Sequence, residues 1–494
     1  MGKKNRKPVS QAQSSGVPCL DRSTKKDILE LCNQLLEKCT RSNGAGPKDW
    51  DEFMEIFNLV EKIREKQKHL VSVSQKTSRE WSSFLQWLQE NNVDTSRVTT
   101  DEFPVYGFGL RATQNLKEGD LFLSVPRKLM ISTETASRSQ IGFLIEEDKL
   151  LQSMPNVVLA IHLLSESKNS DSFWYPYISC LPKNYNTTLY FNPEELKLLK
   201  GSPVLTEAFN HYQRIARQYA YFYKLFQNNH YAQKFPLREG FTYDDYRWAV
   251  STVMTRQNQI PSSNGNQMIN ALIPFWDMCN HCNGQLSTDF DLVENCGKCY
   301  AMVNFQKGEQ IFIFYGPRSN SELLIHNGFV YMENLFDTLT IKLGISKSDP
   351  LYALKSEVLA RLSMLPSKSF QLNAGSKPVS RELLSFLRVI CMNQENLQER
   401  FTGENAADLL SQMGNEEVIV SQENEMKVWQ FIATRVQLLL KTYTTSLETD
   451  EHLDNNELSE RAKLSLQMVM CEKRILNSTL DYAKSKKLSL STAE

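Results

Sequence analysis

The β-type sequence of this chain is divided into two regions that lie far apart, and this division limits the folds that it can adopt. Glycine-punctuated runs typical of short strands occur at residues 105–132, and β-type runs return only at residues 300–305 and 310–314. The residues between them, from about 133 to 248, have a helical pattern with one aromatic-rich segment. Because neither β-type region alone makes a stable sheet, the two regions must meet in space.

Helical patterns flank the β-type regions on both sides. The first residues are polar and lack apolar periodicity, so they predict a disordered tail. Three helical patterns follow, and the first two are separated by a run rich in glycine and asparagine. After a strand-like run at 338–343, the remainder is helical in pattern almost to the end. We therefore expect an α+β chain with a disordered tail at 1–24, an N-terminal helical region at 25–95, a β-rich domain at 96–316 with a helical insertion at about 133–250, and an all-helical domain at 330–485.

The charge and the apolar content of the chain argue against several functional classes. It carries 56 Lys and Arg against 57 Asp and Glu, a formal net charge of −1, whereas a duplex nucleic-acid binder has a one-sided count. No run reaches the roughly 18 apolar residues that cross a bilayer, and no signal-peptide core follows the basic start. We therefore expect a cytoplasmic protein without a nucleic-acid or membrane partner, and residues 2–7 leave a nuclear-import patch open.

Four cysteines form a motif that suggests a metal. Cys279 and Cys282 make one C-x-x-C pair, and Cys296 and Cys299 make a second, at a spacing close to that of structural zinc modules. However, a chain of 494 residues does not need a metal to stabilise its core. Cys279 also belongs to a segment with another use. We expect free thiols and no metal, and stoichiometric zinc in the purified protein would overturn this expectation.

Four other segments form an ordered pattern. They are Gly107-Phe108-Gly109-Leu110-Arg111-Ala112, Arg256-Gln257-Asn258, Trp276-Asp277-Met278-Cys279-Asn280-His281, and Phe314-Tyr315-Gly316 followed by Asn320, Glu322, Leu323, Gly328 and Phe329. Each segment alone is a weak signal, because a lone G-x-G is usually a turn. Together with Trp174-x-Pro176-Tyr177 and Leu181-Pro182, they resemble the SET-domain methyltransferases, in particular the branch that resembles Rubisco large-subunit methyltransferase.

The resemblance extends over nearly the whole chain and implies a fold and an activity. The fold is the SET-domain β-fold with a long helical insertion and a helical substrate-binding domain. The segment around Asn280 and His281 threads a loop to form a pseudoknot, which is a rare exception to unthreaded topology. The cofactor is S-adenosyl-L-methionine. Within the branch, the sequence is most similar to members that methylate a histidine of actin, which implies a monomeric protein-histidine N-methyltransferase with actin as its protein substrate, acting at the imidazole Nε2.

The residues themselves suit a zwitterionic sulfonium cofactor. Arg256 can form two hydrogen bonds with a carboxylate, Asn280 offers an amide oxygen to an ammonium, and Gly107 allows close approach of the backbone. The resemblance assigns further cofactor contacts to Arg79, Tyr106, Phe108, Asp277, Met278, Cys279, His281, Asn327, Gly328 and Phe329. Tyr106 departs from the acidic residue of similar proteins, and Arg79 matches only if a short gap follows it.

Tyr315 and Asn258 are the predicted catalytic residues. By resemblance, Tyr315 lines the channel through which the methyl group passes, where positioning is the main demand. A histidine with a pKa of about 6.5 is mostly neutral at pH 7, whereas a lysine must first lose a proton. The histidine needs a fixed tautomer instead, which Asn258 would provide by accepting the Nδ1 hydrogen. Substrate contacts by resemblance are Trp276, Ile313 and Arg318, although Trp276 could equally be a core residue.

Two alternatives stay open. The first is a protein-lysine N-methyltransferase of the same branch, which labelled methyl groups found only on lysine peptides would support. The second is a non-catalytic scaffold with a degenerate cofactor site, marked by Tyr106. Absence of heat on titration of S-adenosyl-L-methionine would favour the scaffold.

Overall fold

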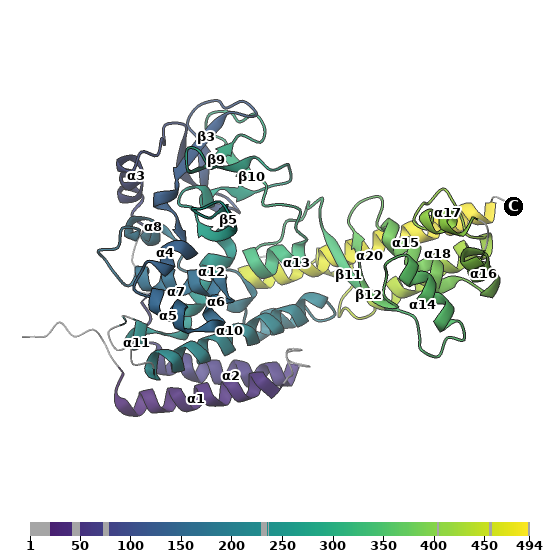
Figure 1. Cartoon of the computed structure of the whole chain (residues 1–494), viewed down its shortest axis with the longest axis horizontal. Helices are drawn as coiled ribbons and strands as arrows, with labels where there is room; N and C mark the ends of the chain where they lie inside the picture. Colours follow the sequence, from purple (N-terminus) through teal and green to yellow (C-terminus); the bar gives the residue numbers. More distant parts are fainter. Residues whose placement is uncertain are drawn as a thin grey trace, which may run out of the picture. The chain divides into compact units, whose positions relative to one another are not determined.

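The computed structural model describes residues 20–41, 50–72, 79–228, 235, 237–402, 405–453 and 457–492. Residues 1–19 of the predicted tail lie outside this part, and residues 22–24, which were also predicted to belong to the tail, are helical. The chain divides into two compact units: the first is 1–80, 133–183 and 213–250, and the second is 81–132, 184–212 and 251–494. Figure 1 shows the elements in chain order. Among the described helices, none is both long and apolar enough to span a bilayer.

The first unit is helical. The helices α1 (Arg22–Arg41) and α2 (Trp50–Gln67) lie side by side, as Figure 1 shows in purple. The insertion adds α4 (Thr133–Ser137), α5 (Gly142–Glu147), α6 (Lys149–Gln152), α7 (Pro155–Ser167), α8 (Tyr175–Cys180), α10 (Pro203–Asn228, shared with the second unit), α11 (Leu237–Gly240) and most of α12 (Tyr243–Arg256). Tyr219 of α10 stacks on Phe241 with ring centroids 5.3 Å apart, so the aromatic-rich helix forms part of this core. The predicted helical insertion is therefore present.

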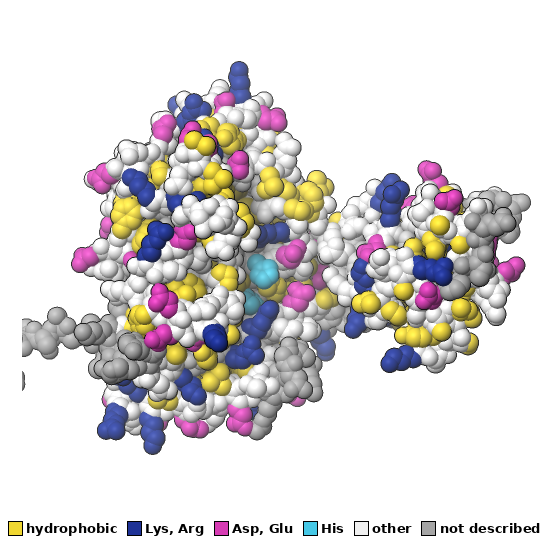
Figure 2. All heavy atoms as spheres, in the orientation of Figure 1, with side chains coloured by type: hydrophobic (Ala, Val, Ile, Leu, Met, Phe, Trp, Pro, Cys, Tyr) yellow, Lys and Arg dark blue, Asp and Glu magenta, His cyan; other side chains and the backbone are white. Residues whose placement is uncertain are grey.

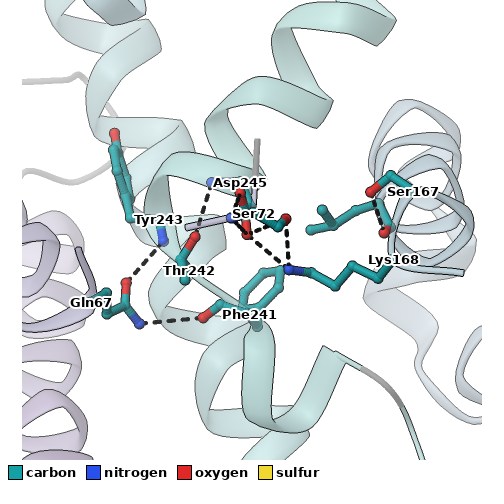
Figure 3. Close-up of polar contacts among 9 residues, drawn as sticks. Gln67, Ser72, Ser167, Lys168, Phe241, Thr242, Tyr243 and Asp245 are labelled. Atoms are coloured by element: carbon teal, nitrogen blue, oxygen red, sulfur yellow. Dashed lines mark hydrogen bonds and ion pairs between the residues drawn. The ribbon is translucent and has the colours of Figure 1, made fainter. Parts of the chain in front are cut away.

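Buried polar contacts hold the end of α2 within the first unit (Figure 3). Gln67 donates from Nε2 to the carbonyl oxygen of Phe241 at 3.3 Å and accepts at Oε1 from the amide of Tyr243 at 3.0 Å. The buried carboxylate of Asp245 accepts from the amide and the hydroxyl of Ser72, both at 3.0 Å, and from Lys168 Nζ at 2.9 Å. A buried ion pair thus joins the segment after α2 to the segment after α7 and to the start of α12.

The second unit begins with α3 (Trp81–Glu90), close to its predicted place, and contains small sheets that combine distant segments. The first sheet has the order β1-β2-β10-β7, with β1 (Val98–Phe103), β2 (Gly107–Ala112), β10 (Gln310–Ile313) and β7 (Asn280–His281). The second contains β3 (Leu121–Pro126), β9 (Cys296–Tyr300) and β8 (Thr288–Asp291), and the third β4 (Ile131–Ser132), β6 (Met268–Leu272) and β5 (Gln257–Pro261). Each sheet uses strands from both sides of the insertion, which confirms that the β-type regions meet.

The predicted strand at 300–305 is wrong in its bounds. The strand β9 ends at Tyr300, and beyond it Phe305 makes an isolated bridge with Leu116. Val303 gave this segment an apolar pattern, but its side chain is 48% exposed, so it does not mark a buried strand position. Apolar residues at exposed positions are common and carry no information about strands.

The second unit also contains several short helical elements. They are η2 (Arg127–Leu129), η3 (Thr188–Tyr190), α9 (Pro193–Lys197), η5 (Trp276–Met278), α13 (Asn320–Glu322) and the π-helix η6 (Leu323–Asn327). The C-terminal region contains β11 (Thr338–Gly344), α14 (Tyr352–Arg361), β12 (Ser367–Asn373), α15 (Arg381–Cys391), α16 (Gln394–Thr402), α17 (Ala406–Ser411), α18 (Gln422–Leu440), α19 (Leu447–Glu451) and α20 (Glu460–Thr492). The long α20 packs along α18, as Figure 1 shows in yellow and green.

The C-terminal region is mostly helical, but it is not all-helical as predicted. The strand-like run at 338–343 forms β11, and β12 pairs with it in antiparallel register. Phe370 and Leu372 of β12 face inward while their neighbours are more exposed. Two apolar residues that alternate in a short run are a weak signal for a strand, so the sequence pattern did not distinguish β12 from the surrounding helices.

The charged side chains on the face shown in Figure 2 are of both signs, as expected for a net charge of −1.

Candidate active site

All but one of the predicted site residues belong to the second unit, and the motifs on β2, β7 and β10 lie in one sheet. The strand β7 pairs in parallel with β10, so that Asn280 is opposite Phe312 and His281 is opposite Ile313. On the other side, β10 pairs with β2. A Cβ atom at Gly109 would lie 2.8 Å from Asn280 Nδ2, so glycine allows the close approach of this amide to β2. The motifs around β2, β7 and β10 therefore meet in one place.

The amide of Asn280 is oriented by the backbone of β2. Its Nδ2 donates to the carbonyl oxygen of Phe108 at 3.3 Å. With the amide nitrogen used in this way, Oδ1 is the atom that can accept from a ligand ammonium. An ideal Cβ at Gly107 meets no atom within 4 Å, so the backbone there borders open space. Both features fit the predicted cofactor end of the site.

Tyr315 lies directly after β10 and connects this strand to the segment before β7. Its hydroxyl donates to the carbonyl oxygen of Cys279 at 2.6 Å, and its amide donates to His281 Nδ1 at 3.2 Å. Burial raises the pKa of the Tyr315 phenol well above its usual range. The phenol therefore stays protonated at neutral pH, where it can orient a group but cannot act as a base.

His281 lies within a cluster of aromatic rings. Its ring stacks against Phe314 with centroids 5.7 Å apart and contacts those of Tyr315, Phe329 and Tyr331 at 5.1, 6.1 and 5.6 Å. Burial, with a smaller contribution from the positive charge of Arg318, lowers the pKa of His281 to about 4. The imidazole is thus neutral, and its side chain positions the site while its backbone remains the predicted cofactor contact.

Arg256 ends α12 and is held by Asp277. Its Nη1 donates to the backbone oxygen of Asp277 at 2.9 Å and lies 3.4 Å from Oδ2 of the same residue, whose side chain is fully buried. The phenol of Tyr185, which shares a hydrogen bond of 2.9 Å with the Thr252 hydroxyl, lies beside this guanidinium. Asp277 therefore anchors the arginine that is predicted to bind the cofactor carboxylate.

Asn258 follows Arg256 by two residues, on β5. Its Nδ2 donates to the carbonyl oxygen of Arg256 at 3.2 Å. This contact assigns the amide nitrogen to the backbone, so Oδ1 is the atom that can accept a hydrogen bond from a substrate. The role of Asn258 as an acceptor for a substrate imidazole stays a prediction.

Arg318 and Asn327 lie on either side of the α13–η6 turn and contact each other. Arg318 Nη1 donates to Asn327 Oδ1 at 2.8 Å, and Asn327 Nδ2 points to the carbonyl oxygen of Thr255 at 3.5 Å. Gly328 follows with a φ of 79°, and a Cβ there would lie 2.9 Å from the backbone of Asn186. The glycine is thus required, and it places Phe329 next to Tyr315, with ring centroids 6.5 Å apart.

Several predicted residues are largely buried. Trp276, Ile313 and Met278 are each 5% exposed, and Cys279 is 1% exposed. The Trp276 ring packs over Gly297 of β9, where a Cβ would lie 2.8 Å from it, so this part of the ring belongs to the core. Tyr106 is 44% exposed and packs edge-on against Phe312 at 5.2 Å, so it adds an apolar surface beside β10.

Arg79 is the exception, because it belongs to the first unit, and its role remains a prediction. No sequence pattern indicates Tyr185 or Tyr331, which lie beside Arg256 and His281. No spacing rule connects either of them with the motifs. Only the folded chain identifies them as neighbours of the site.

The cysteine pairs lie on different elements. Cys279 precedes β7, whereas Cys296 and Cys299 lie on β9, and Cys282 follows β7. None of these four cysteines forms a disulfide, and burial raises the pKa of Cys279 and of Cys299. Within the part of the chain that the structure describes, no group of three or more His, Cys, Asp or Glu side chains is arranged to hold a metal. Free thiols without zinc remain a prediction for metal analysis.

Comparisons with known proteins agree with this geometry. The SET domain model matches residues 107–316, and the model for Rubisco LSMT substrate-binding matches residues 346–476. The chain is 47% identical over 486 residues to the actin-histidine N-methyltransferase of Callithrix jacchus, covering 98% of this chain and 81% of that protein. It is 45% identical over 485 residues to the enzyme of the same name from Xenopus tropicalis, covering 98% and 83%.

Solved structures show the same fold. A structure of Rubisco LSMT bound to AdoMet is 25% identical with a TM-score of 0.65, covering 84% of this chain and 94% of that chain. A structure of Rubisco LSMT bound to sinefungin and monomethyllysine gives a TM-score of 0.67 at 24% identity, with the same coverage. The fold and the matched domains are those of a SET-domain methyltransferase with a Rubisco LSMT-like substrate-binding region. The chain belongs to the family of the actin-histidine N-methyltransferases.

Proposed function

We propose that the protein transfers a methyl group from S-adenosyl-L-methionine to the Nε2 nitrogen of a histidine in actin. Relatives named actin-histidine N-methyltransferase support the reaction class and the substrate. The observation that carries the choice of nitrogen is the orientation of Asn258, whose Nδ2 donates to Arg256. Its Oδ1 can accept the Nδ1 hydrogen of a substrate imidazole, which leaves the Nε2 lone pair as the nucleophile.

The residues at the site fit the cofactor. Arg256 provides a cation for the cofactor carboxylate, Asn280 Oδ1 accepts from its ammonium, and the open backbone at Gly107 admits a close ligand contact. Phe329 and the neighbouring aromatic rings offer an apolar surface for a nucleobase. When bound, S-adenosyl-L-methionine supplies a methyl group on a positively charged sulfur. Partners of the right type for each part of this molecule are thus present around β2, β7 and η6.

Tyr315 and Asn258 act by positioning. The substrate imidazole is mostly neutral at pH 7 and needs no base before it attacks. Tyr315 remains a protonated phenol fixed on the Cys279 carbonyl oxygen, so it can shape the channel without taking a proton. Asn258 holds the Nδ1 hydrogen, which is the proton that leaves after the methyl group has been transferred. The chain therefore accelerates the reaction by orienting the imidazole, which is the main demand of a direct displacement.

Asn258→Ala tests this proposal. We expect it to lower kcat about 100-fold with an actin peptide, because the imidazole tautomer is no longer fixed. Gln259→Ala is a matched control, since Gln259 is the exposed next residue on β5. Mass spectrometry and NMR of the product identify the methylated atom. Methylation at Nδ1 or on lysine, or an unchanged rate in Asn258→Ala, would contradict the proposal.

We also propose that the protein acts as a monomer in the cytoplasm. The described cysteines are free thiols, which suits a reducing compartment. Light scattering of the purified chain measures its oligomeric state, and imaging of the tagged chain measures its location. A stable dimer or a purely nuclear signal would contradict these two points.

A further inference from the structure

The charges around Tyr315 do not balance. Arg256, Asp277 and Arg318 are the charged groups that act on its phenol. Arg256 and Asp277 form an ion pair with a separation of 3.4 Å, so their charges largely compensate. Arg318 has an amide as its partner instead, and no described carboxylate lies within the 4.0 Å of an ion pair from its guanidinium. One uncompensated positive charge therefore remains beside the reacting position.

This charge is held in place from several directions. The guanidinium donates to Asn327 Oδ1 at 2.8 Å, and the carbonyl oxygen of Arg318 accepts from Asn334 Nδ2 at 2.8 Å. Asn327 ends the π-helix η6, a rare element that often occurs at functional sites. Gly328, whose conformation and close contact with Asn186 require glycine, fixes the turn that follows. Arg318 is therefore part of a rigid turn, unlike an arginine on a mobile surface.

Two carboxylates lie near this turn, and among the described residues neither forms an ion pair with Arg318. Glu322 accepts from the amide and the hydroxyl of Ser319, and Asp337 accepts from the amide of Asn320. Tyr315 and Cys279 have raised pKa values and stay protonated and neutral, and His281 has a lowered pKa and is neutral as well. Arg318 itself contributes to the lowered pKa of His281. His326 lies next to Asn327 and is exposed. The positive charge of Arg318 thus acts on the rings that line the site.

We propose that Arg318, held by Asn327, selects a neutral nitrogen as the methyl acceptor by repelling a cationic one. A lysine with a pKa of about 10.4 arrives at neutral pH as an ammonium, whereas a histidine with a pKa of about 6.5 arrives mostly neutral. A fixed cation close by raises the free energy of the bound ammonium and leaves a neutral imidazole nearly unaffected. The inference rests on the proposed function, and it adds a specificity determinant that acts by charge.

Asn327→Asp tests the charge directly because it adds a carboxylate at the guanidinium, and it also removes the Nδ2 donor that points to the Thr255 carbonyl oxygen, so it is compared with the Arg318 variants below. The new carboxylate would stand 2.8 Å from the guanidinium, neutralise Arg318 and preserve the side-chain shape. We expect the ratio of kcat/KM for a lysine-containing to a histidine-containing actin peptide to rise about tenfold. Arg318→Gln removes the charge directly and should raise the same ratio. Arg318→Lys keeps the charge and should leave the ratio within about twofold of the parent chain.

The pH profile provides a readout that a purely structural role does not change. In the parent chain, Arg318 lowers the pKa of the bound substrate imidazole, so kcat should persist to lower pH than the free peptide allows. In Asn327→Asp this acid limb should move to higher pH, because the bound imidazole can be protonated more easily. His326→Gln should leave the limb in place, which separates the titration of the exposed His326 from that of the substrate.

The outcomes distinguish this inference from the proposed function. If the parent chain methylates no histidine peptide, the proposed function fails. If it methylates histidine, but the lysine-to-histidine ratio and the acid limb are the same in Asn327→Asp and in Arg318→Gln, the charge-selection inference is wrong. For a variant without turnover, the affinities of the lysine-containing and the histidine-containing peptide are measured by calorimetry in the presence of S-adenosyl-L-homocysteine. The ratio of these two affinities then replaces the ratio of kcat/KM values. An unchanged affinity ratio there also overturns the inference.

Discussion

Mild acid should destabilise the folded chain through two buried histidines. His162 of α7 is fully buried in the first unit, and burial lowers its pKa to about 4. His281 is 4% exposed in the second unit, and burial with the Arg318 charge lowers its pKa to about 4 as well. Its Nδ1 already accepts from the amide of Tyr315, so protonation would remove a hydrogen-bond acceptor. Both side chains are therefore folded as neutral imidazoles.

The magnitude follows from proton linkage. An unfolded histidine has a pKa of about 6.5, so below that pH the unfolded state binds more protons than the folded state. Stability is therefore complete above the unfolded pKa and is lost as the pH falls from about 6.5 towards 4. At pH 5.0, a pKa difference from about 6.5 to about 4 corresponds to roughly 2 kcal/mol for each histidine. Each unit should lose this amount of unfolding free energy relative to pH 7.5.

Urea titrations at pH 7.5 and 5.0 measure this loss, with pulsed hydrogen exchange at one common labelling pH as the readout. Peptides from α7 report on His162, and peptides from β7 and β10 report on His281, so the two units are followed separately. His162→Gln and His281→Gln serve as reciprocal controls. Each variant lowers the stability of the unit that contains its substitution, because packing is lost. It should also remove about 2 kcal/mol from the pH dependence of stability in that unit and leave the pH dependence of the other unit unchanged.

The result that refutes this reasoning is an acid loss of the same size in the parent chain and in both variants. Buried carboxylates would then be responsible, since they also titrate in this range. A chain that is more stable at pH 5.0 than at pH 7.5 would contradict the sign of the argument. It would mean that the imidazoles gain anionic partners in the folded state.

Three further changes have definite expectations. Tyr315→Phe removes the donor to the Cys279 carbonyl oxygen and should lower kcat about 100-fold, with cofactor affinity by calorimetry nearly unchanged. Asp245→Asn leaves the mostly buried Lys168 without its counter-ion and should cost about 3 kcal/mol in urea unfolding, and adding Lys168→Met should recover most of it. Burial raises the pKa of Glu472 from 4.5 to about 8, so the stability that its protonated form provides is complete below pH 4.5 and is lost as the pH rises from there to about 8. The melting temperature of Glu472→Gln relative to that of the parent chain should therefore rise between pH 4.5 and pH 8 and stay constant above pH 8.

The pairing of distant β-type regions could be predicted because it follows from a general requirement. Strands near residue 110 and near residue 311 cannot be stable alone, and the structure pairs Leu110 with Ile311. The residues of the β7 motif, in contrast, could be singled out only by the family resemblance, because a lone G-x-G is usually a turn. The first prediction rests on a physical requirement, and the second rests on the order of the motifs.

Other features could not be predicted because they depend on partners chosen by the fold. The strand β12 is formed by pairing with β11, and its own pattern is short. Trp276 is compatible with a substrate wall or with the core, and the contact of its ring with Gly297 decides in favour of the core for that part of the side chain. Tyr185 has no motif and becomes a neighbour of Arg256 only after folding. Sequence patterns identify residues that can bind a ligand or take part in a reaction. They do not identify the neighbouring residues that change the charge or the orientation of those residues.

The two arginines of the site illustrate this point most directly. In the sequence, Arg256 and Arg318 are equivalent cations, and the net charge of −1 averages over the whole chain. In the structure, Arg256 has a buried carboxylate beside it, whereas Arg318 has an uncharged amide. Arg256, paired with a carboxylate, can bind a ligand carboxylate while its own charge is largely compensated. Arg318, paired with an amide, exerts an electric field on its surroundings that its partner does not compensate. The difference between Asp277 and Asn327 as partners therefore supports the roles proposed above, with Arg256 binding the cofactor carboxylate and Arg318 discriminating between neutral and charged acceptors.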